Sequence, residues 1–287
     1  MILRRLRDSR ADAEAVRTVA TAAFGDGAFG GAPEDRQAVR FLRRVRHLVT
    51  TDPDGCWLAE DDAGRPLGAA LACLRENVWG LSLFAVVPRA QGKGAGTELM
   101  RRVAEYGRGV LRGMICARPH PAATRLYRAA GFTLHPTVRL TGAVDAGRLA
   151  APDGPAIEGG AAHRDLMDSV DRRVRGAAHG PDHTELLRHC RVVVADDLAG
   201  SGYCYLDDSG RVELLAATSR RIAVRLLGSA LLSLPPGVAA SVRHLTAEQE
   251  WAVDVGLAAG LDLSADGFLC LRGMRPPAPY LPSVQYL

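Results

Sequence analysis

The sequence predicts an α/β (α+β) protein built from two similar halves, and three observations support this. Apolar runs of strand length alternate with amphipathic helical stretches along the 287 residues. A pattern recurs: residues 126–132 parallel 255–261 at an offset of 129, and residues 83–86 parallel 214–217 at 131. Residues 150–155 hold two prolines and a glycine between periodic segments. We therefore predict domains at 1–149 and 156–287, joined by a linker at 150–155.

Composition excludes several classes of protein. The chain is 47% hydrophobic and 24% charged, as is usual for globular domains. No run approaches the ~18 apolar residues of a membrane helix, and no apolar secretory leader follows Met1. The first 155 residues carry 23 basic and 16 acidic side chains, the remainder 13 and 16. Such a modest excess suits a small anionic ligand, and we expect neither a nucleic acid nor a membrane partner.

The six cysteines lie among apolar neighbours and form no C-x-x-C pair or zinc-ligand spacing. This pattern is typical of reduced, buried thiols. We therefore expect a cytoplasmic protein without a metal site.

In the first half, the periodicity predicts an ordered series of elements. Residues 25–33 are Gly-rich and predict a loop. The expected strands are 2–7, 56–59, 67–74, 79–87, 113–117 and 138–140, and the expected helices are 13–24, 34–49, 97–110 and 121–130.

The second half repeats this alternation. The expected helices are 164–174, 222–232 and 247–259, and the expected strands are 191–195, 203–206, 212–217, 237–243 and 268–272. Residues 276–287 hold four prolines and show no periodicity.

The segment 79–100 is the most informative for function. An apolar strand ends at Val87–Pro88, and a loop with three glycines in five positions precedes a helix. Without Cβ atoms, such a loop allows backbone N–H groups to point inward, and the helix N-terminus adds partial positive charge. Lys93, the only lysine, adds a point charge. Together they predict a phosphate or pyrophosphate cradle. The glycine spacing fits neither the P-loop nor the dinucleotide fingerprint.

Two segments resemble motifs of the GNAT superfamily of acyl-CoA-dependent N-acyltransferases. Residues 87–96, VPRAQGKGAG, resemble motif A, with Gln91, Gly94 and Gly96 at its marked positions. Residues 123–132, ATRLYRAAGF, resemble the family's Ala-x-x-Leu-Tyr-x-x-x-Gly-Phe segment. The resemblance covers about residues 1–142.

The resemblance implies a mostly antiparallel, V-splayed sheet with acetyl-CoA lying in the splay. The pyrophosphate would bind the amides of residues 92–97. One departure is His120, which stands where the family usually has an Asn that helps to hold the pantetheine arm. The implied cofactor-binding residues are Ala85, Val86, Val87, Gln91, Gly92, Lys93, Gly94, Ala95, Gly96, Thr97, His120, Ala123 and Tyr127.

By resemblance, Tyr127 lies beside the CoA sulfur as general acid. A phenol with an ordinary pKa of about 10 can protonate a thiolate. A backbone N–H near Val86 or Val87 would polarise the acyl carbonyl. The general base stays open. Glu76 is the best-placed carboxylate, Ser82 could relay through water, and two histidines titrate in the right range, His47 and His120.

The second half is interpreted as a degenerate copy. The segment aligned with the phosphate loop, residues 222–227, has no glycine, and Gly256 stands where Tyr127 stands in the first copy. Tandem GNAT proteins such as mycothiol synthase resemble this layout. We expect no CoA site in the second half.

The expected function is acetyl transfer from acetyl-CoA to an amine, directly within a ternary complex. A two-domain wall favours a small-molecule acceptor, and the protein is expected to be a monomer or homodimer. Two alternatives stay open: a non-catalytic acyl-CoA-binding sensor or scaffold, and a transferase that draws its aminoacyl group from charged tRNA. The −3 charge of the second half argues against the tRNA alternative.

Overall fold

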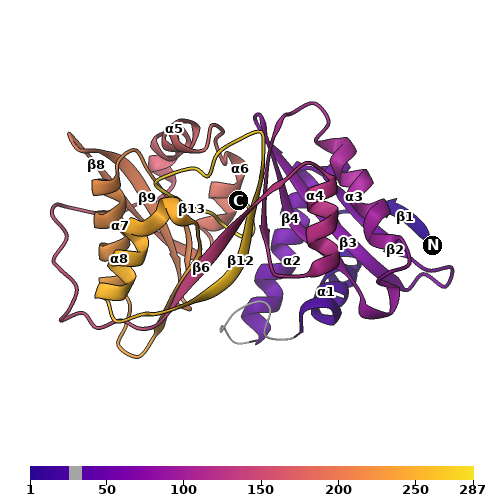
Figure 1. Ribbon diagram of the computed structural model, residues 1–287, viewed down its shortest axis with the longest axis horizontal. Helices are drawn as coiled ribbons and strands as arrows, with labels where there is room; N and C mark the ends of the chain where they lie inside the picture. Colours follow the sequence, from indigo (N-terminus) through magenta and orange to yellow (C-terminus); the bar gives the residue numbers. More distant parts are fainter. Residues whose placement is uncertain (26–33) are drawn as a thin grey trace. The chain divides into compact units, whose positions relative to one another are not determined.

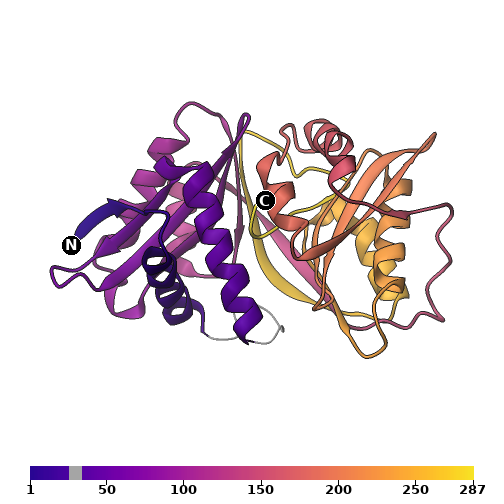
Figure 2. The same ribbon diagram turned by 180° about the vertical axis from the view of Figure 1, so that it is seen from behind.

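The computed structural model describes residues 1–25 and 34–287, which divide into two compact units. The first unit comprises residues 1–115, 120–133 and 287, and the second comprises 116–119 and 134–286. Each unit is an αβ assembly of sheet and helices (Figures 1 and 2). The mixed, mostly antiparallel α/β class predicted from the sequence is confirmed. The loop predicted at 25–33 lies, except for Gly25, outside the described residues.

Five strands form the sheet of the first unit, in the order β1-β2-β3-β4-β5. Neighbours are antiparallel except β4 and β5, which run parallel. The strands are β1 (Ile2–Arg5), β2 (Cys56–Glu60), β3 (Pro66–Arg75), β4 (Val78–Val86) and β5 (Arg112–Ala117).

Four helices cover this sheet: α1 (Arg10–Phe24), α2 (Glu34–Thr51), α3 (Ala95–Tyr106) and α4 (Pro121–Ala129). The helices α3 and α4 lie over one face (Figure 1), and α1 and α2 over the other (Figure 2). Helix α1 starts where the Ser9 hydroxyl accepts a hydrogen bond from the Asp12 N–H, and its Val16 and Val19 are fully buried. The helical periodicity of the sequence therefore reflects burial against the sheet.

Strands β4 and β5 pair only at their N-terminal ends. Three residue pairs join them, from Val78 opposite Arg112 to Gly80 opposite Met114. From Leu81 onward, the described pairing of β4 is with β3 alone. One edge of β4 therefore opens toward its C-terminal end, where the glycine-rich loop begins.

The second unit contains a five-stranded sheet, β13-β10-β9-β8-β7, and three further neighbouring strands, β12-β6-β11. The strands are β6 (Thr133–Ala143), β7 (Ile157–Glu158), β8 (Cys190–Asp197), β9 (Gly200–Asp207), β10 (Val212–Ala217), β11 (Ala239–Leu245), β12 (Asp262–Arg272) and β13 (Tyr280–Leu281). The helices are α5 (Arg164–Val174), α6 (Pro181–Leu186), α7 (Arg220–Leu232) and α8 (Glu250–Ala258).

An internal repeat relates the two halves of the chain. Helix α8 begins and ends 129 residues after α4, and strand β12 begins and ends 129 residues after β6. The turns between them match as well: the Phe132 N–H donates to the Tyr127 carbonyl, and the Leu261 N–H donates to the Gly256 carbonyl. This agreement supports the duplication inferred from sequence.

The differences from the expected elements lie mainly in the second half. Helix α6 and the two-residue strands β7 and β13 were not predicted, because they are too short to show periodicity. Strand β6 is much longer than the expected 138–140. All six cysteines are free thiols. Within the described residues, no helix combines the length and the apolar character required to cross a bilayer.

Candidate active site

The glycine-rich loop follows the open end of β4. After a short 3-10 turn (Pro88–Ala90), the side chain of Gln91 folds back, and its Nε2 donates to the Val86 carbonyl over 3.0 Å. Gln91 thereby hydrogen-bonds the carbonyl of the last β4 residue and fixes the direction in which the loop leaves the strand.

Two loop glycines have backbone conformations that other residues rarely adopt. Gly92 has φ 72° and Gly94 has φ 88°, and a Cβ at either position would meet nothing within 4 Å. Gly94 is also the N-cap of α3, and its cap lacks a side-chain hydrogen bond. The first N–H groups of α3 therefore keep their capacity to bind an anion.

The other loop residues complete this surface. Lys93 and Thr97 are exposed, whereas Ala95 is buried. A Cβ on Gly96 would stand 3.5 Å from Leu126 and 3.7 Å from Phe84, which is ordinary van der Waals contact, so Gly96 lies beside both side chains without being required by the packing. The exposed side chains of Lys93 and Thr97 thus lie at the start of α3.

The strand pairing decides which backbone N–H groups of β4 face the open edge. The Val87 N–H donates to the Leu67 carbonyl of the β3 side over 2.9 Å, so it is not available to an acyl carbonyl. Antiparallel pairing alternates, so the Ala85 N–H also points toward β3, whereas the N–H groups of Phe84 and Val86 point to the opposite edge. Of the two expected donors, Val86 is therefore the one that faces the splay.

Ser82 is the extra residue of a β-bulge in β4. Leu83 pairs with Leu71 and Leu81 pairs with Ala72, which leaves Ser82 outside the register. Arg44 of α2 binds it. Its Nη2 donates to Ser82 Oγ over 2.7 Å and to the Ser82 carbonyl, and its Nε donates to Oγ over 3.2 Å. Both side chains are buried. The sequence analysis singled out Ser82 but missed Arg44.

Tyr127 of α4 is 5% exposed and meets β4 through its ring. It contacts Phe84 edge to face, with 6.2 Å between ring centroids. Phe84 lies on the part of β4 that is no longer paired with β5. The structure thus brings Tyr127 to the open edge and near the loop.

His120 serves as the N-cap of α4. Its Nδ1 accepts a hydrogen bond from the Ala123 N–H over 3.3 Å. The backbone N–H of Ala123 is thereby engaged, and the remaining ring nitrogen of a neutral His120 carries the proton. Both residues lie in the first turn of the helix that carries Tyr127.

Glu76 lies apart from these residues. It is exposed in the turn between β3 and β4, with φ 51°, at the end of β4 opposite the glycine-rich loop. Glu76 therefore lies at the end of β4 that is far from the contact between Tyr127 and Phe84.

The second unit lacks the corresponding features. Residues 222–227 correspond in the internal repeat to the glycine-rich loop of the first half, but they lie inside α7. That helix is capped by Ser219, whose hydroxyl accepts the Ile222 N–H. A Cβ on Gly256 would stand 2.4 Å from a methyl of Leu140, so Leu140 fills the space of a tyrosine ring there.

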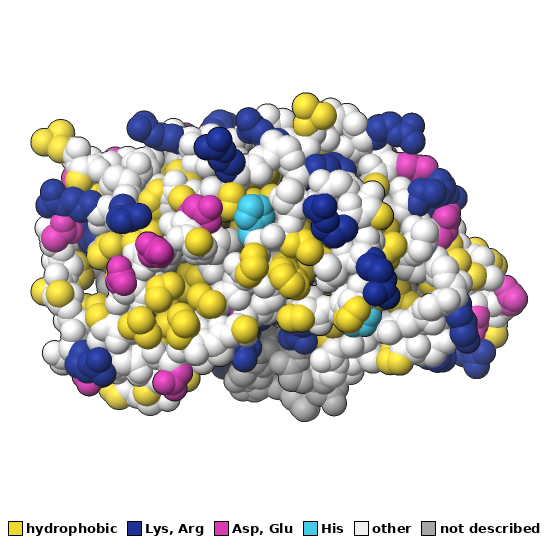
Figure 3. Space-filling view, viewed as in Figure 1, with side chains coloured by type: hydrophobic (Ala, Val, Ile, Leu, Met, Phe, Trp, Pro, Cys, Tyr) yellow, Lys and Arg dark blue, Asp and Glu magenta, His cyan; other side chains and the backbone are white. Residues whose placement is uncertain are grey.

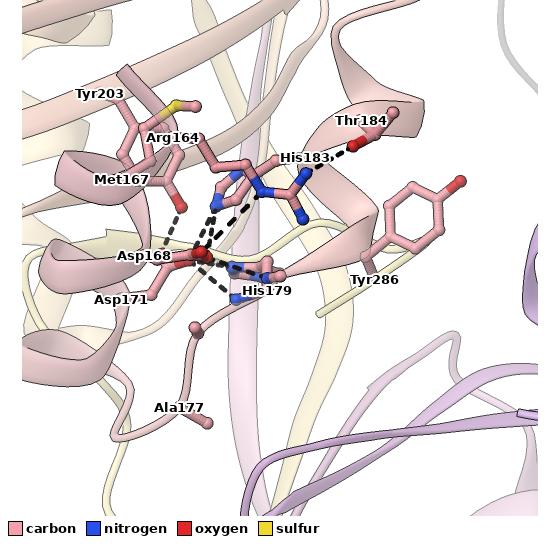
Figure 4. A network of polar contacts seen from close by, with 12 residues as sticks. Arg164, Met167, Asp168, Asp171, Ala177, His179, His183, Thr184, Tyr203 and Tyr286 are labelled. Atoms are coloured by element: carbon pink, nitrogen blue, oxygen red, sulfur yellow. Dashed lines mark hydrogen bonds and ion pairs between the residues drawn. The ribbon is translucent and has the colours of Figure 1, made fainter. Parts of the chain in front are cut away.

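A fully buried polar cluster occupies the second unit (Figure 4). Asp171 of α5 accepts hydrogen bonds from the His179 N–H, from the Tyr203 hydroxyl and, at 2.7 and 3.1 Å, from ring nitrogens of His179 and His183. Asp171, His179 and His183 each offer one atom of a type that can bind a metal, and these three atoms lie within 4.8 Å of one another. The sequence analysis missed this cluster, although the i, i+4 spacing of His179 and His183 was a signal for it.

Arg175 determines how this cluster is protonated. Its Nη1 lies 2.8 Å from His179 Nε2, and because a guanidinium only donates, Nε2 accepts. The His179 proton is then on Nδ1 and points at Asp171. Burial lowers the pKa of His179, in the same direction as repulsion by Arg175. The cluster is thus organised as a chain of hydrogen bonds, and its protonated Nδ1 is not arranged as a metal ligand.

Residues 16–132 match the model of the acetyltransferase (GNAT) family. This segment of the chain is therefore similar to acetyltransferases of the GNAT family. No curated protein matches the sequence.

Solved structures share the fold over both units. A putative acetyltransferase from Pyrococcus horikoshii superposes with TM-score 0.77 at 18% identity, over 100% of this chain and 95% of that chain. A GCN5-related N-acetyltransferase from Sphaerobacter thermophilus gives 0.62 at 18% identity, over 96% of each. A tandem GNAT protein from the clavulanic acid biosynthesis pathway superposes with TM-score 0.58 at 14% identity, over 94% of this chain and 98% of that chain. The tandem layout predicted from the repeat is thus found in a structural neighbour.

Proposed function

We propose that this protein transfers an acetyl group from acetyl-CoA directly to an amine, within a ternary complex. One observation carries this proposal. Helix α3 starts after Gly92 and Gly94 with no side-chain hydrogen bond at its N-cap, and it follows the C-terminal end of β4, where β4 is no longer paired with β5. The pyrophosphate of CoA would bind the amides of residues 92–97 there, with Lys93 adding its charge. The family match over residues 16–132 supports the same donor.

The acyl carbonyl would accept a hydrogen bond from the Val86 N–H, which faces the open edge of β4. This donor is fixed by the sheet, so it stabilises the developing oxyanion without reorganisation. The attacking amine nitrogen forms the new amide bond, and the C–S bond breaks. Tyr127 then donates its phenolic proton to the departing thiolate.

The attacking nitrogen must lose a proton, and we place Ser82 in this step as a relay through water. His120 lies at the start of the helix that carries Tyr127, and its Nε2–H would contact the pantetheine arm.

We propose a small-molecule amine as acceptor, one CoA per chain, and a cytoplasmic monomer or homodimer. The capped α7 and Leu140 at the position of the tyrosine ring support a single CoA site. An aminoacyl-tRNA donor is less favoured, because on the face shown in Figure 3 the Lys and Arg side chains are interspersed with acidic and hydrophobic ones.

The test is calorimetric titration with acetyl-CoA, followed by free-thiol release against a panel of small amines and lysine peptides. One CoA bound per chain, with thiol release only with small amines, is the expected result. Binding without release by any amine would favour the sensor alternative. A folded protein that binds no acetyl-CoA would refute the proposal, and release with peptides alone would overturn the acceptor class.

A further inference from the structure

The side chains of β4 change faces along the strand. The indole N–H of Trp79 donates to the Val103 carbonyl of α3 over 3.0 Å, so this side chain lies on the face that α3 covers. Phe84 and Val86 lie on the same face, because a Cβ on Gly96, at the start of α3, would stand 3.7 Å from a carbon of each side chain. Side chains of a regular strand alternate, so residues 79 and 84 would lie on opposite faces. The alternation is therefore reversed between them.

The reversal falls at the bulge of β4. Leu81 and Leu83 pair with two successive residues of β3, which leaves Ser82 as one extra residue. An extra residue moves the residues beyond it to the other face of the sheet and turns their N–H groups to the other edge. The bulge therefore decides what the C-terminal part of β4 presents to its open edge.

Two groups beyond the bulge depend on this register. The Val87 N–H donates to the Leu67 carbonyl on the β3 side, so the Val86 N–H faces the open edge. A strand without the extra residue would present the Val87 N–H there and turn the Val86 N–H toward β3. The Phe84 ring would also leave the face on which it meets the Tyr127 ring, at 6.2 Å between centroids. One extra residue thus sets both the proposed oxyanion donor and the ring beside the proposed acid.

Arg44 holds the bulge from α2, on the other side of the sheet from α3 (Figure 2). Its Nη2 lies 2.7 Å from Ser82 Oγ and also donates to the Ser82 carbonyl, and its Nε donates to Oγ over 3.2 Å. In a regular strand this carbonyl would point within the sheet toward a neighbouring strand, away from a helix that covers the face. Both side chains are buried, and charged donors bind strongly where water is excluded. The guanidinium therefore favours the bulged register over the regular one.

We infer that Arg44 is a positioning residue for acetyl transfer, which acts through the bulge at Ser82 to direct the Val86 N–H toward the acyl carbonyl. The inference rests on the proposed function, because it concerns the same site. Arg44 acts through β4, whereas the pyrophosphate would bind the amides of residues 92–97. Its loss should therefore slow the transfer step and leave acetyl-CoA affinity unchanged, and the loss of one oxyanion donor typically slows catalysis by about 100-fold or more.

The first arm of the test reads the register without any ligand, by amide hydrogen exchange followed residue by residue with NMR. In the wild type the Val87 amide should be protected, and the Val86 amide should exchange faster. Arg44→Met should remove this contrast. Val16→Ala is the matched control, because it removes fully buried volume from α1 of the same unit and destabilises it without removing a hydrogen bond of the bulge. It should keep the contrast.

The second arm measures acetyl-CoA affinity by calorimetry and kcat by thiol release with a small amine, at a temperature where each variant is folded. We expect Arg44→Met to lose about ten-fold or more in kcat with its acetyl-CoA affinity retained, and Val16→Ala to keep both. Arg44→Lys keeps the charge but lacks the fork that reaches both Ser82 oxygens, so its kcat should fall between. This variant decides the question if Arg44→Met does not fold.

The outcomes separate this inference from the proposed function. A folded wild type that neither binds acetyl-CoA nor releases thiol refutes the proposed function, and this inference with it. An active wild type with the same kcat in its Arg44 variants, or with equal losses in Arg44→Met and Val16→Ala, overturns the inference alone. An unchanged exchange contrast in Arg44→Met also overturns it, because the register then does not depend on the guanidinium.

Discussion

Arg44 holds the bulge of β4 through Ser82, its partner 38 residues away in the sequence. Nη2 of Arg44 lies 2.7 Å from Ser82 Oγ and also donates to the Ser82 carbonyl. A bulge leaves one residue of the ladder unpaired, and here a buried guanidinium supplies the missing donors. The residues that follow the bulge, Phe84 and Val86, present their N–H groups to the open edge.

Arg44→Met should therefore lower the free energy of unfolding by about 2 to 3 kcal/mol, because the Ser82 carbonyl and hydroxyl lose a charged donor in a buried place. Ser82→Ala removes only the hydroxyl and should cost about 1 kcal/mol. Urea denaturation measures both. Arg43→Met, at an exposed position on the same helix, is the control. Equal costs for Arg44→Met and Arg43→Met would contradict the role given to Arg44.

Gly94→Ala should weaken acetyl-CoA binding by about ten-fold or more while the fold is retained. A Cβ there meets no atom within 4 Å, so the cost is conformational: at φ 88° alanine is strained by about 1–2 kcal/mol, and the loop would leave this form. Gly64→Ala is a matched control, since Gly64 has φ 73° and equally open space but lies in the turn between β2 and β3. Calorimetry and thermal unfolding separate the two effects. Parallel losses of CoA affinity in both variants would show that the loop is only a turn.

Tyr127→Phe should lower kcat about 100-fold or more and leave acetyl-CoA binding intact. The phenyl ring keeps its edge-to-face contact with Phe84, and only the proton donor is lost. Thiol release measures kcat once an acceptor is known. Tyr106→Phe is the comparison, because the Tyr106 hydroxyl donates to Asp52 and should affect stability alone. An unchanged kcat in Tyr127→Phe would remove Tyr127 from the mechanism.

The second unit should depend on its buried carboxylate. Asp171→Asn leaves the His179 and His183 rings and the Tyr203 hydroxyl without their anionic partner in a fully buried place. We expect a loss of about 3–5 kcal/mol in the free energy of unfolding. Asp168→Asn, a partly exposed neighbour on the same helix, should cost much less. A single measurement by denaturant titration compares them, and equal losses would refute this account of the cluster.

Stability should fall as the pH is lowered from about 6.5 toward 4. The folded-state pKa of His244 is lowered to about 4, so between these values the unfolded chain binds a proton that the folded chain does not. Each such group costs about 1.4 kcal/mol per pH unit in this window and nothing above it. The lowered pKa of His179 acts in the same direction.

The check compares the pH dependence of the wild type with that of His244→Asn in phosphate-free buffer. Asparagine tolerates the positive φ of this position better than most residues. The variant should show a shallower slope between pH 6.5 and 4. An unchanged slope would mean that His244 does not titrate as its burial requires.

Much of the first unit follows from local sequence. The strand, the glycines of the loop, the helix behind it and the two family-like motifs are all contiguous, so spacing alone predicted them. Gly92 and Gly94 adopt the positive φ angles that their type allows, and Pro121 and Gly131 bound the helix of Tyr127 as expected. The two-copy layout was equally visible, because α4 and α8 stand 129 residues apart.

The tertiary structure alone decided which of these residues meet. In the structure, Arg44 binds Ser82, and the Val87 N–H donates to the Leu67 carbonyl. The Val86 N–H therefore faces the open edge of β4, and Glu76 lies at the other end of that strand. The tertiary structure also gathered Asp171 with two histidines. Periodicity reports which face of an element is buried, but partners distant in the chain depend on strand register and packing, which no local pattern contains.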